Sequence, residues 1–369
     1  MPETVDDGVS VMNSPQIFQK LGKRAARTIF GLIGGIGAWI LIEPFVTDTA
    51  QSISELFTES APQSSLAMWA LGCALIGISI VGLEELVWGN KKRAIRGAII
   101  AGFVGFFGGG MSQVIGSFIW FKVFGPIVLS FGGNELMQYC WLIIARSFTW
   151  ALMGGIIGLS LGIVRKSLKG SINSAIGGVL GGLTGGVLFD TIAPFFGMLL
   201  TFGLIEAGWA SRSIGLMLIG ALIGLFSTIA EQLLSPATLK VISSGRMEGR
   251  EFVLDKPILT MGRDERCDIS LYYDDEILMR HALLQWCGDG YVITPQGNAK
   301  IFANNLPVVS KKLEDGDVIT VGKTRLLFRK RRMTSVSATS SGRMCEVCGT
   351  INRAGAKYCR NCGSSLTKL

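Results

Sequence analysis

The stretch Leu313-Glu-Asp-Gly-Asp-Val-Ile-Thr-Val-Gly322 decides the fold of the C-terminal part of this chain. It places an acidic, glycine-containing turn before alternating apolar and polar residues, the pattern of a strand with one buried face. Similar short strand-like pieces fill the sequence after Leu234, whereas nearly all long apolar runs lie before that residue. A length of 369 residues is enough for two or three domains. The change of pattern at Leu234 divides the chain into two parts.

Three motifs follow one another in the C-terminal part: Gly262-Arg263, Arg280-His281-Ala282 and Leu313–Gly322. In order and approximate spacing they resemble the forkhead-associated (FHA) domain, a β-sandwich whose usual ligand is a phosphothreonine peptide. The resemblance predicts an all-β sandwich over residues 239–331, with Leu239–Ile242 and Arg250–Leu254 as its first strands. It implies recognition of a partner rather than catalysis.

The resemblance also assigns roles to individual residues. Arg263 matches the arginine that contacts phosphate, and His281, the only histidine of the chain, matches a histidine that braces the loops by hydrogen bonding. Leu278 stands where the family has a phosphate-contacting serine, and leucine has no donor. Phosphate recognition needs converging cationic or hydroxyl donors, so this part of the site is altered.

The loop that holds the peptide backbone in the family, Ser-x-Asn-Gly-Thr, is altered as well. One alignment places Ala299-Lys300-Ile301 over its Asn-Gly-Thr, and a slip of one residue gives the gripping role to Asn298. The candidate phosphopeptide-binding residues are therefore Arg263, Arg280, Asn298 and Lys300. Two alternatives stay open: phosphothreonine binding by this set, and a degenerate domain that binds an unphosphorylated protein.

The N-terminal part contains apolar runs that approach or reach the roughly 20 residues that a helix needs to cross a bilayer. They predict an all-α polytopic bundle of six transmembrane helices over residues 28–234, after a cytoplasmic tail over residues 1–27. The runs are Thr28–Phe45, Leu66–Leu83, Gly97–Ile119, Ser147–Val164, Ile172–Phe189 and Ile214–Leu234. The shorter segments Leu136–Ile144 and Met198–Leu204 are expected to be interfacial or to extend a neighbouring helix.

Basic residues flank alternate ends of these runs. They are Lys20, Lys23, Arg24 and Arg27, then Lys91, Lys92, Arg93 and Arg96, then Arg165, Lys166 and Lys169. The loop Val46–Ser65 carries acidic residues and no basic one. Because cytoplasmic loops carry the excess of lysine and arginine, both termini are expected on the cytoplasmic side of a cell membrane. The polar, acidic first twenty residues do not have the character of a cleavable signal peptide.

An internal repeat relates the helices. Arg146–Leu159 aligns with Arg212–Leu225 without gaps, and Trp69–Ser79 aligns with Trp150–Ser160 in the same way. The second, fourth and sixth runs are thus alike, which predicts three copies of a two-helix hairpin in parallel topology.

Glycines spaced four apart are the second signal in these helices. Gly177, Gly181 and Gly185 share one helical face, Gly178, Gly182 and Gly186 the adjacent one, and Gly154, Gly158 and Gly162 repeat the pattern in another helix. Such a glycine zipper lets helices approach closely, either within one chain or in a homo-oligomer. A glycine-lined pore is the alternative. The few ionisable groups near the runs are expected at outer helix ends or in outer loops: Glu43, Lys122, Arg146, Asp190, Glu206 and Arg212.

The C-terminal tail carries a metal-type motif. Cys345, Cys348, Cys359 and Cys362 follow the pattern C-x2-C-x10-C-x2-C, with a glycine after each pair. Four thiolates suit the closed tetrahedral site of structural Zn²⁺. The motif resembles short zinc ribbons and predicts one over residues 344–369, after a Ser/Thr-rich linker over residues 333–343.

Together these features favour a membrane-anchored scaffold or signalling adaptor that recruits a cytosolic protein or phosphoprotein and contacts membrane lipid. With a single histidine, the sequence contains no recognisable catalytic constellation, so we do not expect an enzyme. We do not expect nucleic-acid binding either, because much of the net charge of +8 flanks apolar runs. The alternative is a channel or transporter regulated by its FHA and zinc-ribbon modules.

Overall fold

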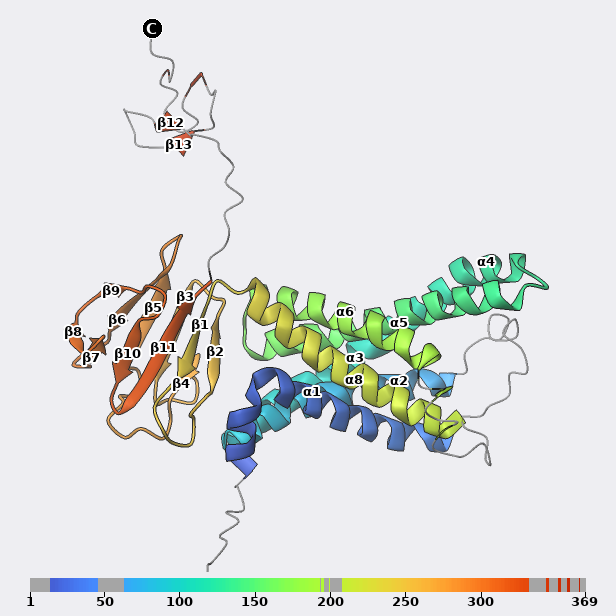
Figure 1. The fold of residues 1–369 in the computed structure, drawn as a ribbon, viewed down its shortest axis with the longest axis horizontal. Coiled ribbons are helices and arrows are strands. Elements are labelled where there is room, and N and C mark those ends of the chain that lie inside the picture. Colours follow the sequence, from blue (N-terminus) through green and yellow to red (C-terminus); the bar gives the residue numbers. More distant parts are fainter. Residues whose placement is uncertain are drawn as a thin grey trace, which may run out of the picture. The chain divides into compact units, whose positions relative to one another are not determined.

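A computed structural model describes residues 14–45, 63–192, 194–195, 199, 208–331, 343–344, 351–352, 357–358 and 365. Residues up to Lys330 form one compact unit, which consists of long helices and a β-sandwich (Figure 1). Residues from Arg331 onward form a second unit. Its described strands, Arg343–Met344 (β12) and Ile351–Asn352 (β13), pair antiparallel.

Among the described helices, six are long and apolar enough to cross a membrane. They are α1 (Ser14–Ile42), α2 (Gln63–Val87), α3 (Lys91–Ile119), α5 (Glu135–Val164), α6 (Leu168–Thr191) and α8 (Gly208–Leu234). Asn90, Asn134 and Ser167 cap α3, α5 and α6, because each side chain accepts a hydrogen bond from a backbone N–H of the first turn. The expectation of six apolar helices followed by a β-sandwich is confirmed.

Several predicted helix limits are wrong. Residues 14–27 are not a tail, since α1 begins at Ser14 and contains one non-helical residue, Gly22, with φ 72°. The expectation that Leu136–Ile144 extends a neighbouring helix is confirmed, since the segment belongs to α5. Arg146 therefore lies inside this helix rather than at its outer end, where it was expected. After α3 the chain continues through a π-helix (η3, Trp120–Phe124) into α4 (Gly125–Ser130). Of Met198–Leu204, the structure describes only residue 199, and Glu206 lies outside the described residues.

The repeat matches the arrangement of the helices. α1 contacts α8 and α2, α3 contacts α2 and α5, and α6 contacts α5 and α8, so the six helices close into a ring. α5 also contacts both α2 and α8. The repeat-related helices α2, α5 and α8 therefore form the inner part of the ring, with α1, α3 and α6 between them.

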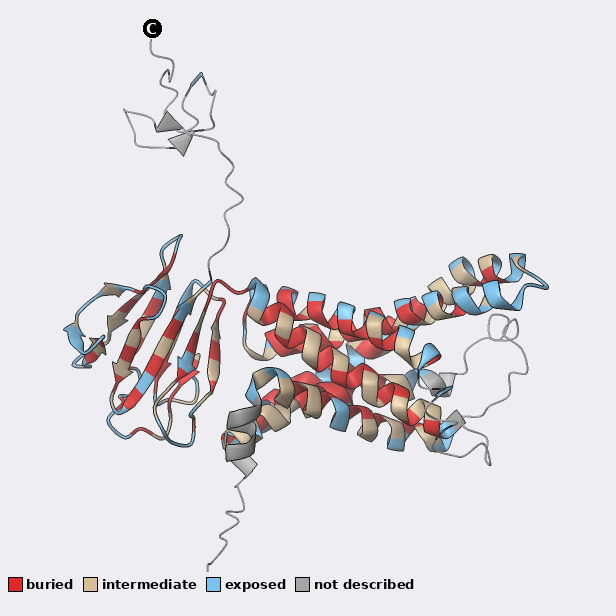
Figure 2. Cartoon of the chain, in the orientation of Figure 1, coloured by how far each residue is buried: buried red, intermediate tan, exposed pale blue. Residues whose placement is uncertain are grey.

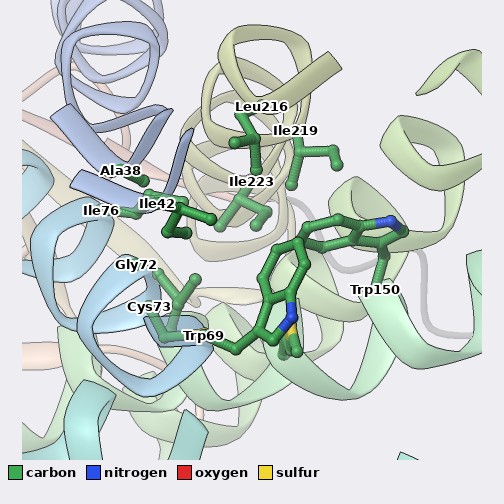
Figure 3. Close-up of a pocket in the computed structure, with 12 residues that line it drawn as sticks. Ala38, Ile42, Trp69, Gly72, Cys73, Ile76, Trp150, Leu216, Ile219 and Ile223 are labelled. Carbon is green, nitrogen blue, oxygen red and sulfur yellow. The ribbon is translucent and has the colours of Figure 1, made fainter. Parts of the chain in front are cut away.

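Side chains fill the axis of this ring. The inner helices contribute three layers at equivalent repeat positions: Trp69, Trp150 and Leu216; Gly72, Met153 and Ile219; Ile76, Ile157 and Ile223 (Figure 3). The two tryptophan rings meet edge to face, with centroids 5.1 Å apart. The space left between these layers is about 10 Å³, at or below the roughly 10–15 Å³ that one water molecule requires.

The glycine faces are covered by neighbouring helices of the same chain. A Cβ on Gly154 of α5 would lie 2.2 Å from the carbonyl oxygen of Gly178 in α6. A Cβ on Gly220 of α8 would lie 2.1 Å from that of Gly31 in α1. These glycines allow backbone-to-backbone contact and do not line a pore, so the glycine-lined pore is not what the structure has. Because these glycine faces are already covered, a homo-oligomer would have to form through a different surface of the helices.

The sandwich begins at Ala237, two residues earlier than predicted, so only Ser235 and Pro236 separate it from α8. One sheet has the order β2-β1-β11-β10-β7-β8 and the other β4-β3-β5-β6-β9. The strands are β1 (Ala237–Val241), β2 (Glu251–Leu254), β3 (Ile258–Gly262), β4 (Ile269–Ser270), β5 (Ala282–Trp286), β6 (Tyr291–Pro295), β7 (Ile301–Ala303), β8 (Leu306–Val308), β9 (Lys311–Lys312), β10 (Val318–Val321) and β11 (Thr324–Lys330).

The core of the sandwich lies between the two sheets. Buried and exposed residues alternate along the strands (Figure 2). Leu239, Leu284 and Phe328 are fully buried there, as are Ile293 and Ile319. This alternation is the pattern that the sequence of the Leu313–Gly322 stretch predicts.

Candidate recognition site

Three loops at one end of the sandwich are joined by hydrogen bonds. They connect β3 to β4, β4 to β5 and β6 to β7. The backbone N–H of Arg263 donates to the carbonyl of Leu278 at 3.0 Å, which ties the first loop to the second. His281 bonds the carbonyl of Lys300 at 3.0 Å, which ties the second to the third. The structure thus brings the candidate residues of all three loops to one end of the domain.

His281 holds two of these loops from inside. It is buried, with 3% of its surface exposed. The backbone N–H of Leu278 donates to its Nδ1 at 3.2 Å. With Nδ1 as acceptor, the neutral ring carries its proton on Nε2 and donates it to the Lys300 carbonyl. The side chain therefore occupies the bracing position that the resemblance implies.

Arg263 is exposed at the start of the first loop. Gly262 before it packs against the second loop, and a Cβ there would lie 2.3 Å from the carbonyl oxygen of Met279. The Arg263 guanidinium lies 3.3 Å from the carboxylate of Asp275, and 44% and 87% of these side chains are exposed. Exposed ion pairs contribute about 1 kcal/mol or less. An anionic ligand can therefore displace Asp275 at low cost.

The rest of the loop surface mixes apolar and basic side chains. Leu278 and Met279 are adjacent in the chain and are 45% and 64% exposed. Arg280, Asn298 and Lys300 are also exposed. Arg280 and Lys300 have no ion-pair partner among the described residues. The surface can therefore offer cations and two apolar anchors, but no hydroxyl at position 278.

Comparison with known proteins identifies the sandwich. The oxoglutarate dehydrogenase inhibitor of Corynebacterium glutamicum is 33% identical over 103 residues, which are 28% of this chain and 71% of that protein. The glycogen accumulation regulator GarA of Mycolicibacterium smegmatis is 34% identical over 99 residues, 27% of this chain and 62% of GarA. Through its sandwich, this chain belongs to the forkhead-associated family.

Other comparisons cover the same region. Residues 241–332 of the FHA domain match the family model described as the cytoplasmic domain of the inner membrane component of T3SS. The FHA domain of CT664 from Chlamydia trachomatis is 25% identical, with 26% of this chain and 99% of that chain covered and a TM-score of 0.24. Residues 341–367 match a model of a domain of unknown function, DUF7577.

Two buried aspartates support the FHA loops. Asp274 accepts hydrogen bonds from the N–H of Lys323 at 2.7 Å and the hydroxyl of Thr324 at 2.8 Å, which ties the β4–β5 loop to the β10–β11 turn. Asp317 accepts from the Asn304 amide at 2.7 Å and from the Lys311 ammonium at 2.9 Å. Burial alone would raise the pKa of Asp317, but a hydrogen bond from the backbone N–H of Glu314 at 2.9 Å and these two side-chain donors outweigh burial, so the pKa lies below its usual value. Sequence reasoning assigned no role to either residue.

The predicted zinc ligands Cys345, Cys348, Cys359 and Cys362 lie outside the described residues, as does nearly all of the linker 333–343. In the part of the chain that is described, no group of three His, Cys, Asp or Glu side chains could hold a metal ion. Cys73, Cys140, Cys267 and Cys287 are free thiols. The zinc ribbon therefore stays a prediction from the sequence.

Sequence reasoning missed a buried cluster of charges at one end of the helices. Glu231 of α8 is 1% exposed and accepts hydrogen bonds from Arg27 at 2.9 Å and Arg165 at 2.8 Å. Lys23 and Ser174 also bond it, at 3.3 and 2.7 Å. Arg27, predicted to end a cytoplasmic tail, is equally buried and pairs with two carboxylates, those of Glu231 and Glu84. An acidic residue inside an apolar run was the available signal.

Proposed function

We propose that this protein is a membrane-anchored adaptor that uses the loops of its FHA domain to recruit protein partners in the cytosol. The observation that carries the proposal is the joined loop surface around Arg263, which has exposed cations and exposed apolar anchors. Membership of the FHA family supports a phosphoprotein as the partner class. The six apolar helices support the anchor.

The surroundings of Arg263 define the expected ligand more closely. Position 278 offers no hydroxyl, so Arg263 has no second phosphate donor beside it at that position. We therefore propose that the partner is held largely through its protein surface, with Leu278 and Met279 as contacts, and that phosphothreonine adds only a weak contribution. Basic residues at alternate helix ends support cytoplasmic placement of both termini. The role is one of binding, without catalysis.

A channel is the less favoured function. Its axis would have to pass the layers of Trp69 and Trp150, which leave only about 10 Å³, at the lower limit of what one water molecule requires. The glycines that suggested a pore are used for contacts between helices. Neither feature supports transport along the axis of the ring.

The proposal is tested by titrating the full chain, in detergent micelles, with matched phosphorylated and unphosphorylated threonine peptide libraries. We expect weak binding that depends little on the phosphate. Arg263→Ala should remove the phosphate-dependent part, and Arg266→Ala, an exposed arginine in the same loop, is the matched control. The adaptor function would be contradicted by two results together: neither library binds, and the full chain captures no protein whose binding is lost in Leu278→Asp.

A further inference from the structure

The FHA domain sits on the helices through a buried arginine. Only two residues connect α8 to β1, and residues up to Lys330 form one compact unit. Arg250, immediately before β2, is 7% exposed. Its guanidinium lies 2.9 Å from the carboxylate of Glu85 in α2, 5.6 Å from the ring centre of Trp88 and 5.0 Å from that of Phe252. Carboxylate and aromatic faces together form a pocket suited to one guanidinium.

The electrostatics of Arg250 agree with this placement. Burial alone would lower the pKa of Arg250, but the carboxylates of Glu85 and Glu84 outweigh burial and raise it. The arginine is therefore held as a cation. Arg93 of α3 also approaches Glu85, at 3.5 Å, so this carboxylate joins the two helices to the FHA domain.

The same end of the helices contacts two of the three recognition loops. Arg93 donates from Nη1 to the carbonyl of Cys267, in the loop that begins with Arg263, at 3.4 Å. Tyr272, in the loop that carries Leu278, donates from its hydroxyl to the carbonyl of Trp88. Trp88 lies in the short turn between α2 and α3. The recognition loops are therefore bonded to this turn as well as to each other.

A glycine in the turn makes room for the domain. Gly89 has φ 83°, a conformation that favours glycine. A Cβ there would also lie 2.1 Å from the guanidinium of Arg246, in the β1–β2 turn. The positive φ therefore favours glycine at this position, and a side chain there would also have to displace the end of the Arg246 side chain.

We propose that the junction between α2 and α3, residues 85–93, is an intramolecular seat that positions two recognition loops of the FHA domain, those joining β3 to β4 and β4 to β5, with Arg250 as its principal positioning residue. The inference rests on the proposed function for the role of the loops, but the seat itself is a physical contact that exists with or without a ligand. Its consequence is coupling: a change in the packing of α2 against α3 alters the loops, and a ligand that shifts the loops alters the turn.

Hydrogen–deuterium exchange on the full chain in detergent micelles, without any peptide, tests the seat. Arg250→Ala leaves Glu85 buried with fewer partners, so amides of residues 264–281 should exchange roughly tenfold faster. Amides of β5 and β10, in the core of the sandwich, should be unchanged, which shows that the domain is still folded. Arg325→Ala, an exposed arginine on β11, is the matched control and should change neither region.

Two further variants keep the test decisive if Arg250→Ala destabilises the whole domain. Arg250→Lys keeps a positive charge beside Glu85, so residues 264–281 should exchange more slowly in it than in Arg250→Ala. Tyr272→Phe should speed exchange in the β4–β5 loop alone, since it removes one hydrogen bond. Loops that exchange at the wild-type rate in Arg250→Ala and in Tyr272→Phe would overturn the seat. Because no ligand is used, a failure of peptide binding leaves this result intact and counts only against the proposed function.

Discussion

Arg165 and Glu231 pair with each other, Nη1 to Oε2, at 2.8 Å, and they fall at equivalent positions when the register of the internal repeat is continued beyond Leu159 and Leu225. The third equivalent position is Glu84. Arg27 links Glu84 to Glu231, because its guanidinium donates to Glu84 at 2.7 Å and to Glu231 at 2.9 Å. Whereas the three layers described above are apolar, this terminal layer is Glu, Arg, Glu. The repeat therefore places opposite charges together at the end of the ring.

The first prediction concerns this charged layer. Glu231→Gln keeps the size of the side chain but removes the negative charge that Arg27, Arg165 and Lys23 share. Breaking a buried ion pair from one side costs about 3–5 kcal/mol, so we expect a loss of about 3 kcal/mol in the free energy of unfolding. Chemical unfolding in mixed micelles measures it.

The opposite end of the helices provides the control. Glu43 pairs with Arg212 at 2.6 Å, but both side chains are partly exposed, at 20% and 23%. The pair makes two hydrogen bonds, at 2.9 and 2.6 Å, so Glu43→Gln should have a measurable cost, but a smaller one than Glu231→Gln because water reaches this pair. Equal effects of the two substitutions would contradict the assignment of Glu231 to a buried network.

Glycine contacts give the second prediction. A Cβ on Gly31 would lie 2.0 Å from the carbonyl oxygen of Gly220, whereas a Cβ on Gly37 in the same helix meets nothing within 4 Å. Gly31→Ala should force α1 and α8 apart and lower the thermal unfolding temperature, and Gly37→Ala should be neutral or slightly stabilising. Scans of both variants in the same detergent compare them directly, and a stable Gly31→Ala protein would refute the close contact.

The sequence predicts most of the architecture because both parts of the chain follow simple periodicities. Long apolar runs set six helices, and alternation with FHA motifs sets the sandwich. The limits of the helices were harder to predict, since hydropathy does not show how far a helix continues beyond its membrane-spanning part. The segment Leu136–Ile144, which belongs to the same helix as the apolar run after it, is an example. Arg27 and Glu231 were missed because their burial depends on partners on other helices. The contact between Arg250 and Glu85 joins residues far apart in the chain, and no local pattern indicates it.

The third prediction uses the titration of Asp317. Its pKa is lowered in the folded protein, so it contributes stability above the unfolded pKa of about 3.9 that is lost as pH falls below that value. Asp317→Asn should therefore lower the stability of the FHA domain at pH 7 by about 2 kcal/mol and make it less sensitive to acid. Urea unfolding of residues 237–331, followed by the fluorescence of Trp286, their only tryptophan, measures both effects.

Asp275 is the matched control for that experiment. Its carboxylate is 87% exposed and touches only Arg263, so Asp275→Asn should change the stability by less than about 0.5 kcal/mol. If Asp317→Asn and Asp275→Asn shared the same acid profile as the wild type, the acid sensitivity would have to come from other groups.

The fourth prediction tests the metal in the C-terminal tail. Cys345→Ser removes one of four expected thiolate ligands, so the zinc content should fall from about one per chain to near zero. The tail should then become sensitive to protease while the FHA domain stays folded. Atomic emission on the purified protein measures the metal, and Cys287→Ser, which changes an exposed free thiol, is the control. Unchanged zinc in the Cys345 variant would refute the ribbon.

The last prediction concerns Leu278, which replaces a phosphate-contacting hydroxyl. If the loops still bind phosphothreonine, Arg263 supplies most of the interaction, because the serine hydroxyl that would be the second donor is absent. A hydrogen bond to a charged group contributes about 1.5–3 kcal/mol, so Leu278→Ser should strengthen phosphopeptide binding by about one to two powers of ten. Leu278→Ala removes the same apolar surface without adding a donor and should not strengthen it.

Binding of the natural partner should respond in the opposite way. Leu278 is 45% exposed beside Met279, and if these two side chains contact the partner protein, Leu278→Ser and Leu278→Ala should weaken that complex alike. Arg263→Ala should have little effect on it. Titration calorimetry with both ligands separates the two modes. Micromolar affinity of the wild-type chain for a phosphothreonine peptide, lost in Arg263→Ala, would show instead that phosphate recognition persists without the serine.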